Sequence, residues 1–219
     1  HLTQARLAAD RIQNGIDLSR YGETKLKPLR SETKATLKIS EGKKVFVLIG
    51  SGYERKGVAQ AIEALARSGT RATLLVVGHE KRESRYRTLA KRLGIEADVL
   101  FLGRQENVLP YLAAADAMIL PSIYDPFPSA TLEGFAAGLP VVTSEACGAR
   151  DIAREIDPGL VRDANDIPGL AYAIRIASRF SDIPETKQPP RAVAARFDTE
   201  LMADRMLALY ERVAKETSA

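Results

Sequence analysis

Residues 45–77 read VFVLIGSGYERKGVAQAIEALARSGTRATLLVV, and this stretch decides the fold. It opens with the aliphatic run Val45–Ile49, passes through a glycine-rich turn and the amphipathic segment Val58–Ser68, and ends in a second aliphatic run, Thr73–Val77. Short, nearly continuous aliphatic runs are typical of strands buried on both faces. Gly69 stands where the intervening helix would end. The stretch therefore predicts two parallel strands joined by a helix.

The same alternation continues along the chain. It predicts further strands at Asp98–Phe101, Ala117–Leu120 and Pro140–Thr143, and a short edge strand at Gly159–Val161. Helices are expected in the amphipathic segments Tyr86–Leu93, Val108–Ala114, Ala130–Ala137, Ile167–Ser178 and Thr199–Lys215. We therefore predict an α/β protein with a Rossmann-like parallel sheet of about six strands and helices on both faces.

Composition divides the chain into three parts. Residues 45–180 form the predicted sheet domain. Residues 1–44 are interpreted as a leading segment and linker, because residues 22–44 are polar and rich in lysine, with at most a short helix near Ser31–Leu37. Residues 181–219 are interpreted as a C-terminal linker followed by the last helix.

The overall composition excludes several classes of protein. Of the 219 residues, 45% are hydrophobic and 27% are charged, which excludes a disordered, collagen-like or disulfide-scaffold chain. One cysteine and two histidines are too few for a cysteine- or histidine-rich metal centre. No apolar run is long enough to span a membrane, and no secretory signal is visible, so a cytoplasmic location is expected. The net charge of +4 suits an anionic ligand, whereas the absence of tryptophan argues against nucleic acid.

The turn after the first strand, GSGYERKG at residues 50–57, has the layout of an anion site. Its glycines bring backbone N–H groups and a helix N-terminus together, while Arg55 and Lys56 supply positive charge. The dinucleotide fingerprint is excluded because its third glycine is replaced by Arg55, and a Walker A loop is excluded by the order Lys56-Gly57-Val58. The alternative interpretation is a tight turn with solvated charges, in which Tyr53 is a surface aromatic residue.

A second segment, LPSIYDPFPSATLEGFAAGLPVV at residues 120–142, carries two acids. Asp125 lies in the loop after the fourth strand, and Glu133 lies early in the helix that begins near Ser129. Ligands of open α/β sheets bind at this edge, where a carboxylate can hold both hydroxyls of a diol and helix amides can hold a phosphate. The alternative is that Ser129 caps the helix and Glu133 complements its dipole.

Together these motifs resemble the C-terminal, donor-binding domain of retaining GT-B glycosyltransferases of group 1. That family has a glycine-rich turn ending in Arg/Lys-Lys-Gly, two acids separated by seven residues, and then Gly-Leu-Pro-Val-Val; this chain has GSGYERKG, Asp125 with Glu133, and GLPVV. NGID at residues 14–17 resembles the element where such chains enter their second domain. GSGYERKGVAQAIEALA, LLVVGHEKR and EACGARDIA are most similar to the lipopolysaccharide core heptose I glucosyltransferases.

The resemblance implies a role for each matched position. Arg55 and Lys56 would hold the donor diphosphate and, with Asp125, would be the catalytic residues. Asp125 would face the sugar, and Glu133 would take the ribose hydroxyls. The remaining donor-binding positions are the turn residues Gly50 and Ser51, Arg104 beside the uracil, and the helix start at Phe127, Pro128, Ser129 and Ala130.

Two departures from the family pattern fall at the sugar end of this site. The first acid is usually glutamate, and Asp125 is one methylene shorter. Pro128 replaces a usual glycine and lacks an amide donor. The identity of the donor sugar therefore stays open.

The resemblance also implies a reaction and its partners. A hexose, expected to be glucose, would pass from a UDP-sugar to a lipopolysaccharide core or other glycan with retention of configuration, without metal or cofactor. The acceptor would bind to an N-terminal domain absent from this chain, toward which the last helix would cross, so the isolated domain is expected to be inactive. Peripheral contact with the inner membrane is a further expectation. The alternatives are another GT-B enzyme, such as a sugar-nucleotide epimerase, and a non-catalytic nucleotide-binding module.

Overall fold

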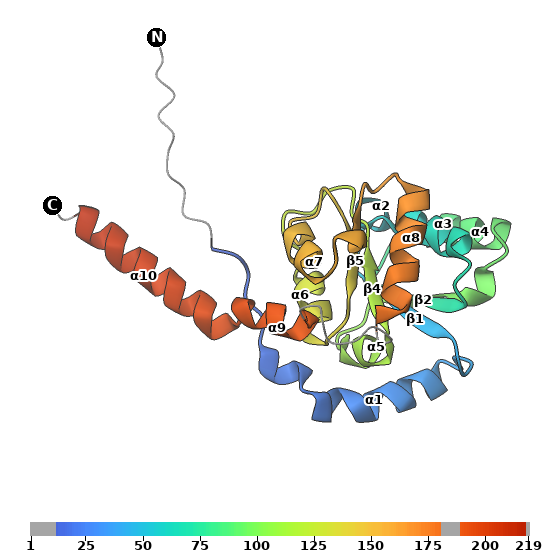
Figure 1. Cartoon of the computed structure of the whole chain (residues 1–219), viewed down its shortest axis with the longest axis horizontal. Coiled ribbons are helices and arrows are strands. Elements are labelled where there is room, and N and C mark those ends of the chain that lie inside the picture. Colours follow the sequence, from blue (N-terminus) through green and yellow to red (C-terminus); the bar gives the residue numbers. More distant parts are fainter. Residues whose placement is uncertain (1–11, 181–188, 218–219) are drawn as a thin grey trace, which may run out of the picture.

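The computed structural model describes residues 12–180 and 189–217, and it is built around one parallel sheet (Figure 1). The six strands lie in the order β3-β2-β1-β4-β5-β6. Every neighbouring pair is parallel. The strands are β1 (Lys44–Ile49), β2 (Ala72–Val77), β3 (Val99–Gly103), β4 (Ala117–Leu120), β5 (Val141–Ser144) and β6 (Val161–Arg162). The predicted fold class is confirmed, and each predicted strand is found within two residues of its expected bounds.

Helices cover both faces of the sheet. The helices α3, α4 and α8 lie on one side, and α5, α6 and α7 lie on the other, while α10 extends away from the body (Figure 1). The helices are α1 (Glu23–Thr36), α2 (Tyr53–Lys56), α3 (Val58–Ser68), α4 (Glu83–Arg92), α5 (Leu109–Ala114), α6 (Ser129–Ala136), α7 (Arg150–Ile156), α8 (Ile167–Ser178), α9 (Pro190–Ala194) and α10 (Thr199–Thr217). Short 3-10 helices are η1 (Leu18–Tyr21), η2 (Glu96–Asp98), η3 (Pro158–Leu160) and η5 (Ala195–Phe197).

Residues 22–44 were expected to be a connector with at most a short helix near Ser31–Leu37, and the structure has a longer helix there. A helix of 14 residues, α1, occupies Glu23–Thr36 and packs against α5. Its anchor is polar: the Arg30 guanidinium donates to the carbonyl oxygens of Ala113 and Ala115 at 3.1 and 2.7 Å and pairs with Asp116. A helix held in this way has no strong apolar stripe, which is why the sequence pattern indicated only a short helix in its second half.

Three short helices, α2, α7 and α9, were also not predicted. Each has seven residues or fewer, too few to show a helical period. The expected linker at residues 181–188 lies outside the described residues.

Strand β1 lies at the centre of the sheet and fixes the position of the functional edge. Four of its residues, Val45–Leu48, are fully buried, and it pairs with both β2 and β4. At its beginning, the Asp116 carboxylate accepts a hydrogen bond of 2.7 Å from the Val45 amide. At its far end, Gly57 has φ +75°, and a Cβ there would lie 2.1 Å from the Pro121 carbonyl oxygen. Only glycine therefore allows the loop after β1 to close against the loop after β4.

Replacement of Asp116 by alanine should destabilise the fold. It would leave the buried Val45 amide without its acceptor and remove the partner of Arg30. We expect a loss of about 1–3 kcal/mol in the free energy of unfolding, measured by urea denaturation. Asp204→Ala, at an exposed position of α10, is the matched control. Equal stability of the two variants would show that the Asp116 contacts do not hold β1.

Candidate functional site

The candidate site lies at the carboxyl edge of the sheet, where the strand order reverses. Strand β1 leads into α2 and α3, whereas its neighbour β4 leads into α6 on the opposite side of the sheet (Figure 1). The loops after these two strands therefore turn toward opposite faces of the sheet. Ligands of open α/β folds bind in the crevice formed between such loops. The motifs at residues 50–57 and 120–133, far apart in the sequence, meet at this point.

Two cations and one carboxylate connect the two sides of the crevice. The Asp125 Oδ2 atom lies 2.7 Å from the Lys56 Nζ atom and 3.0 Å from the Arg55 Nη1 atom. The side chains of Lys56 and Asp125 are only 10% and 8% exposed, whereas that of Arg55 is 52% exposed. A Cβ at Gly50 would lie 2.7 Å from the Lys56 Cε atom, so the glycine makes room for the lysine stem. Lys56 is thus a buried cation whose partner comes from the opposite loop.

The backbone fixes Asp125 in this position. Its amide donates to the Ala146 carbonyl at 3.2 Å, and its carbonyl accepts from the Gly148 amide at 2.8 Å. These bonds form an isolated parallel bridge between Asp125 and Cys147. A Cβ at Gly148 would lie 1.6 Å from the Pro126 carbonyl oxygen, so this contact also needs glycine. The loop after β4 is therefore attached to the loop after β5, and the Asp125 carboxylate is held toward the cations.

The turn after β1 is attached in the same way to the loop after β2. The Ser51 hydroxyl accepts from the His79 amide at 3.1 Å, and the Gly52 amide donates to the His79 carbonyl at 3.3 Å. Tyr53, expected at the surface, is fully buried and donates its hydroxyl to the Gly78 carbonyl at 3.0 Å. That expectation was wrong, because the tyrosine packs edge-to-face on Tyr86 beneath the turn. Burial is the main cause of the raised pKa of Tyr53.

The beginning of α6 presents free amides beside Asp125. The residue before its first turn is Pro128, which provides no side-chain cap, so the alternative in which Ser129 caps the helix was wrong. The amides of Phe127, Ser129 and Ala130 donate to no other group in the described part of the chain. Unpaired amides at a helix start attract anions and polar oxygens.

Glu133 lies in the second turn of α6 and is half-buried against η1. Burial raises the pKa of the Glu133 carboxyl, while Arg20 and the Tyr21 hydroxyl lower it. Tyr21 is 1% exposed, and burial together with Glu133 raises the pKa of Tyr21 to about 12. Sequence reasoning missed Tyr21, whose only signal was its place four residues after the NGID element.

Arg104 lies apart from this cluster. It follows β3, two strands away from β1, and its side chain is exposed. It makes no hydrogen bond or ion pair with another described residue. The predicted residues that the structure brings into contact are therefore Arg55, Lys56 and Asp125, with Gly50 beneath them.

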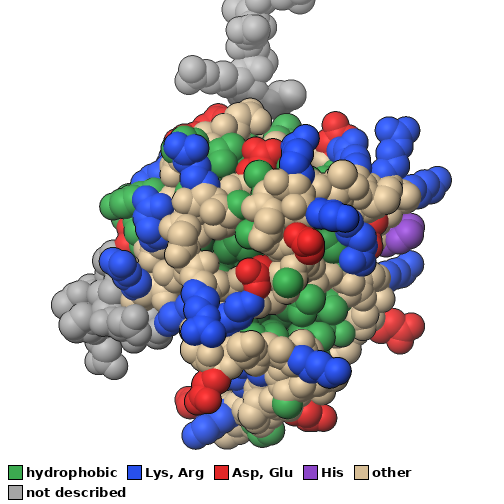
Figure 2. Space-filling model, turned by 90° about the vertical axis from the view of Figure 1, so that its right-hand side faces the viewer, with side chains coloured by type: hydrophobic (Ala, Val, Ile, Leu, Met, Phe, Trp, Pro, Cys, Tyr) green, Lys and Arg blue, Asp and Glu red, His purple; other side chains and the backbone are tan. Residues whose placement is uncertain are grey.

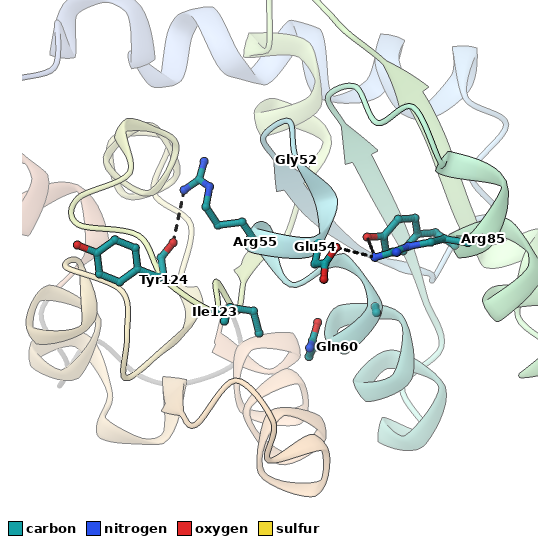
Figure 3. Close-up of a pocket in the computed structure, with 9 residues that line it drawn as sticks. Gly52, Glu54, Arg55, Gln60, Arg85, Ile123 and Tyr124 are labelled. Carbon is teal, nitrogen blue, oxygen red and sulfur yellow. Dashed lines mark hydrogen bonds and ion pairs between the residues drawn. The ribbon is translucent and has the colours of Figure 1, made fainter.

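A hollow of about 700 Å³ lies beside the crevice (Figure 3). Arg55 points away from its centre toward the Tyr124 carbonyl, and Glu54 faces Arg85. Arg55 is the one predicted site residue that lines this hollow. The hollow therefore adjoins the crevice and does not coincide with it. Its lining is Gly52, Glu54, Arg55, Ala59, Gln60, Arg85, Tyr86, Ile123 and Tyr124.

Positive charge is spread over the face that carries α3 and α4, where many Lys and Arg side chains project (Figure 2). Within residues 12–180 and 189–217, no three His, Cys, Asp or Glu side chains are grouped as metal ligands would be. None of the helices described is long and apolar enough to cross a membrane.

Comparison with known proteins identifies the family of the chain. Residues 30–184 match the family described as glycosyl transferases group 1. The lipopolysaccharide core biosynthesis glycosyltransferase LpsE of Rhizobium meliloti is 31% identical over 75% of this chain and 49% of its own length. The lipopolysaccharide glucosyltransferase WaaG of Escherichia coli is 35% identical over 50% of this chain and 30% of its own length. The chain therefore spans about half the length of LpsE and a smaller part of WaaG.

Solved structures show the same architecture. A crystal structure of WaaG matches with a TM-score of 0.63 at 25% identity, over 86% of this chain and 56% of that one. Anabaena HepE in complex with UDP matches with a TM-score of 0.76 at 24% identity, over 92% of this chain and 57% of that one. The family match, the lipopolysaccharide core relatives and the parallel sheet agree: the chain belongs to the glycosyl transferases group 1 family and is a glycosyltransferase domain of the GT-B fold.

Proposed function

We propose that this chain is the donor-binding part of a retaining glycosyltransferase that transfers a hexose, with glucose the expected sugar, from a UDP-sugar to a lipopolysaccharide core or other glycan. The contact that carries this proposal is the one between Arg55, Lys56 and Asp125 across the crevice, next to the free amides that begin α6. Two cations and several unpaired amides at the same edge of the sheet are suited to a diphosphate.

The same groups would also accelerate cleavage of the bond between the sugar and the diphosphate. Cleavage of the bond between sugar and diphosphate builds negative charge on the leaving phosphate, and fixed donors aimed at that phosphate lower the barrier. Lys56 and Arg55 would supply the charge that a metal ion supplies elsewhere, so a metal-independent reaction is part of the proposal. The acceptor would attack on the leaving-group side, and the donor phosphate would receive its proton.

Asp125 would change partners when the donor binds. Without ligand its carboxylate is bound to both cations. A diphosphate would compete for the same cations, and the freed carboxylate could then accept hydrogen bonds from sugar hydroxyls. This exchange would favour a sugar-bearing donor over UDP alone.

The nucleotide half is assigned by position and by relatives. Glu133 would accept hydrogen bonds from the ribose hydroxyls, and Arg104 would border the uracil. WaaG is named a glucosyltransferase, and structures of HepE contain UDP-glucose, or UDP and glucose. We further propose that the acceptor binds to residues outside this chain, and that the protein acts in the cytoplasm with peripheral contact at the inner membrane.

The chain should bind UDP in the presence of excess EDTA. Lys56→Ala should weaken this binding by about 1–3 kcal/mol, because a buried charge-assisted contact to the diphosphate is lost. Isothermal calorimetry measures both effects, with Lys91→Ala, an exposed lysine of α4, as the matched control. Loss of UDP binding on addition of the chelator would show that binding needs a metal ion. Equal affinity of the two variants would show that the diphosphate does not bind at Lys56.

Asp125→Asn should affect the binding of the nucleotide and of the sugar differently. The amide no longer neutralises the cations, so UDP affinity should be kept or increased, while any advantage of UDP-glucose over UDP should disappear. Calorimetry with both ligands measures the ratio, and Asp151→Asn, at an exposed position of α7, is the control. A folded Asp125→Asn variant with a tenfold loss of UDP affinity would show that Asp125 does not compete with the donor.

The 219-residue chain should bind the donor without transferring it. Transfer needs donor and acceptor held together, a positioning effect worth roughly 7–11 kcal/mol of barrier. Release of UDP from UDP-glucose in the presence of lipopolysaccharide core acceptor measures the reaction. Turnover by these residues alone would place the acceptor site within this chain.

A further inference from the structure

Two segments far apart in the sequence lie side by side next to the donor site. The Ile16 amide donates to the Phe197 carbonyl at 2.7 Å, and the Thr199 amide donates to the Ile16 carbonyl at 3.1 Å. These bonds form a parallel bridge between Ile16 and Asp198, which we call the terminal bridge. A Cβ at Gly15 would lie 2.8 Å from the Thr199 Cα, so the two backbones are in close contact. The beginning of α10 is thereby fixed to the segment that leads into η1.

Each side of the terminal bridge contacts one acid-bearing segment of the site. The Phe197 ring packs on the Phe127 ring, with centroids 5.8 Å apart, and Phe127 comes two residues after Asp125. On the other side, η1 packs against α6, and its buried Tyr21 and the Glu133 carboxyl of α6 each shift the pKa of the other. A displacement of α10 would therefore reach the site through Phe197, and a displacement of the leading segment would reach it through Tyr21.

We propose that Tyr21 and Phe197 are positioning residues of the donor site, which hold the Glu133 carboxylate and the 125–128 loop in the geometry that binds the nucleotide. This inference rests on the proposed function. A carboxylate has about four acceptor positions, so Glu133 can interact with the Tyr21 hydroxyl and still accept from two ribose hydroxyls. The ring of Phe197 contacts the loop at Phe127, and the bridge with Cys147 holds the same loop at Asp125.

The influence of Tyr21 on Glu133 can be tested through the ionisation of the Glu133 carboxyl. Arg20 and Tyr21, both in η1, are the charged and titratable side chains that act on this carboxyl, and both lower its pKa against the effect of burial. Removal of the Tyr21 hydroxyl should raise the pKa further, so that Glu133 becomes protonated at a higher pH. The loss of UDP affinity on acidification should then begin at a higher pH than in the unaltered chain.

The first experiment measures UDP affinity of Tyr21→Phe by calorimetry between pH 8 and pH 5. We expect at least about a fivefold loss at neutral pH, because the hydroxyl that favours the charged form of Glu133 is removed, and a pH profile displaced upward. Tyr172→Phe, at an exposed position of α8, is the matched control. A profile identical to that of the control would show that Tyr21 only fills space.

The second experiment compares Phe197→Leu with Phe197→Tyr. Leucine keeps an apolar side chain but removes the ring contact with Phe127, so UDP affinity should fall severalfold, and tyrosine should restore it. Leu207→Ala, on the exposed surface of α10, is the control for general effects on the helix. Thermal unfolding of each variant shows whether the fold is retained.

The outcomes separate this inference from the proposed function. If the unaltered chain binds UDP and Lys56→Ala loses it, while Tyr21→Phe and Phe197→Leu bind as the controls do, the positioning role is wrong and the donor site stands. If the unaltered chain does not bind UDP, the proposed function fails, and the inference fails with it.

Discussion

The pairing of Lys56 with Asp125 across the crevice is the contact on which the candidate site depends. Both side chains are almost fully removed from solvent. A buried charge is tolerated only when it is paired and hydrogen-bonded, so neither group could occupy this position alone. The pair adds to the backbone contacts between the two loops, such as the hydrogen bond of 2.9 Å from the Ile123 amide to the Arg55 carbonyl. It also keeps positive charge at the point where a diphosphate would bind.

Close backbone contacts make this pairing possible. Gly57 lets the turn after β1 approach Pro121, and Gly148 lets the loop after β5 approach Pro126. The Lys56 stem crosses Gly50, where any larger residue would displace it. The glycines at this edge thus allow neighbouring loops to pack closely against one another and leave room for the Lys56 side chain. The charged pair is thereby enclosed between these loops.

Most of the fold could be predicted from the sequence, because strands buried on both faces leave continuous aliphatic runs such as Thr73–Val77. The full length of helix α1 could not be predicted, since polar contacts from Arg30 hold it. Sequence spacing and family resemblance identified Arg55, Lys56 and Asp125, but not that they contact one another, because this depends on how two loops fold back. Tyr21 was missed for the same reason: its partner, Glu133, is more than a hundred residues away.

A crystal structure of the chain with UDP tests the central claim most directly. The predicted result places the β-phosphate within hydrogen-bond distance of the Lys56 Nζ atom and of the amide of Ser129 or Ala130, with Asp125 displaced from at least one of its two cations. The contradicting result would be UDP bound in the neighbouring hollow, against Glu54 and Gln60, with the contact between Lys56 and Asp125 unchanged.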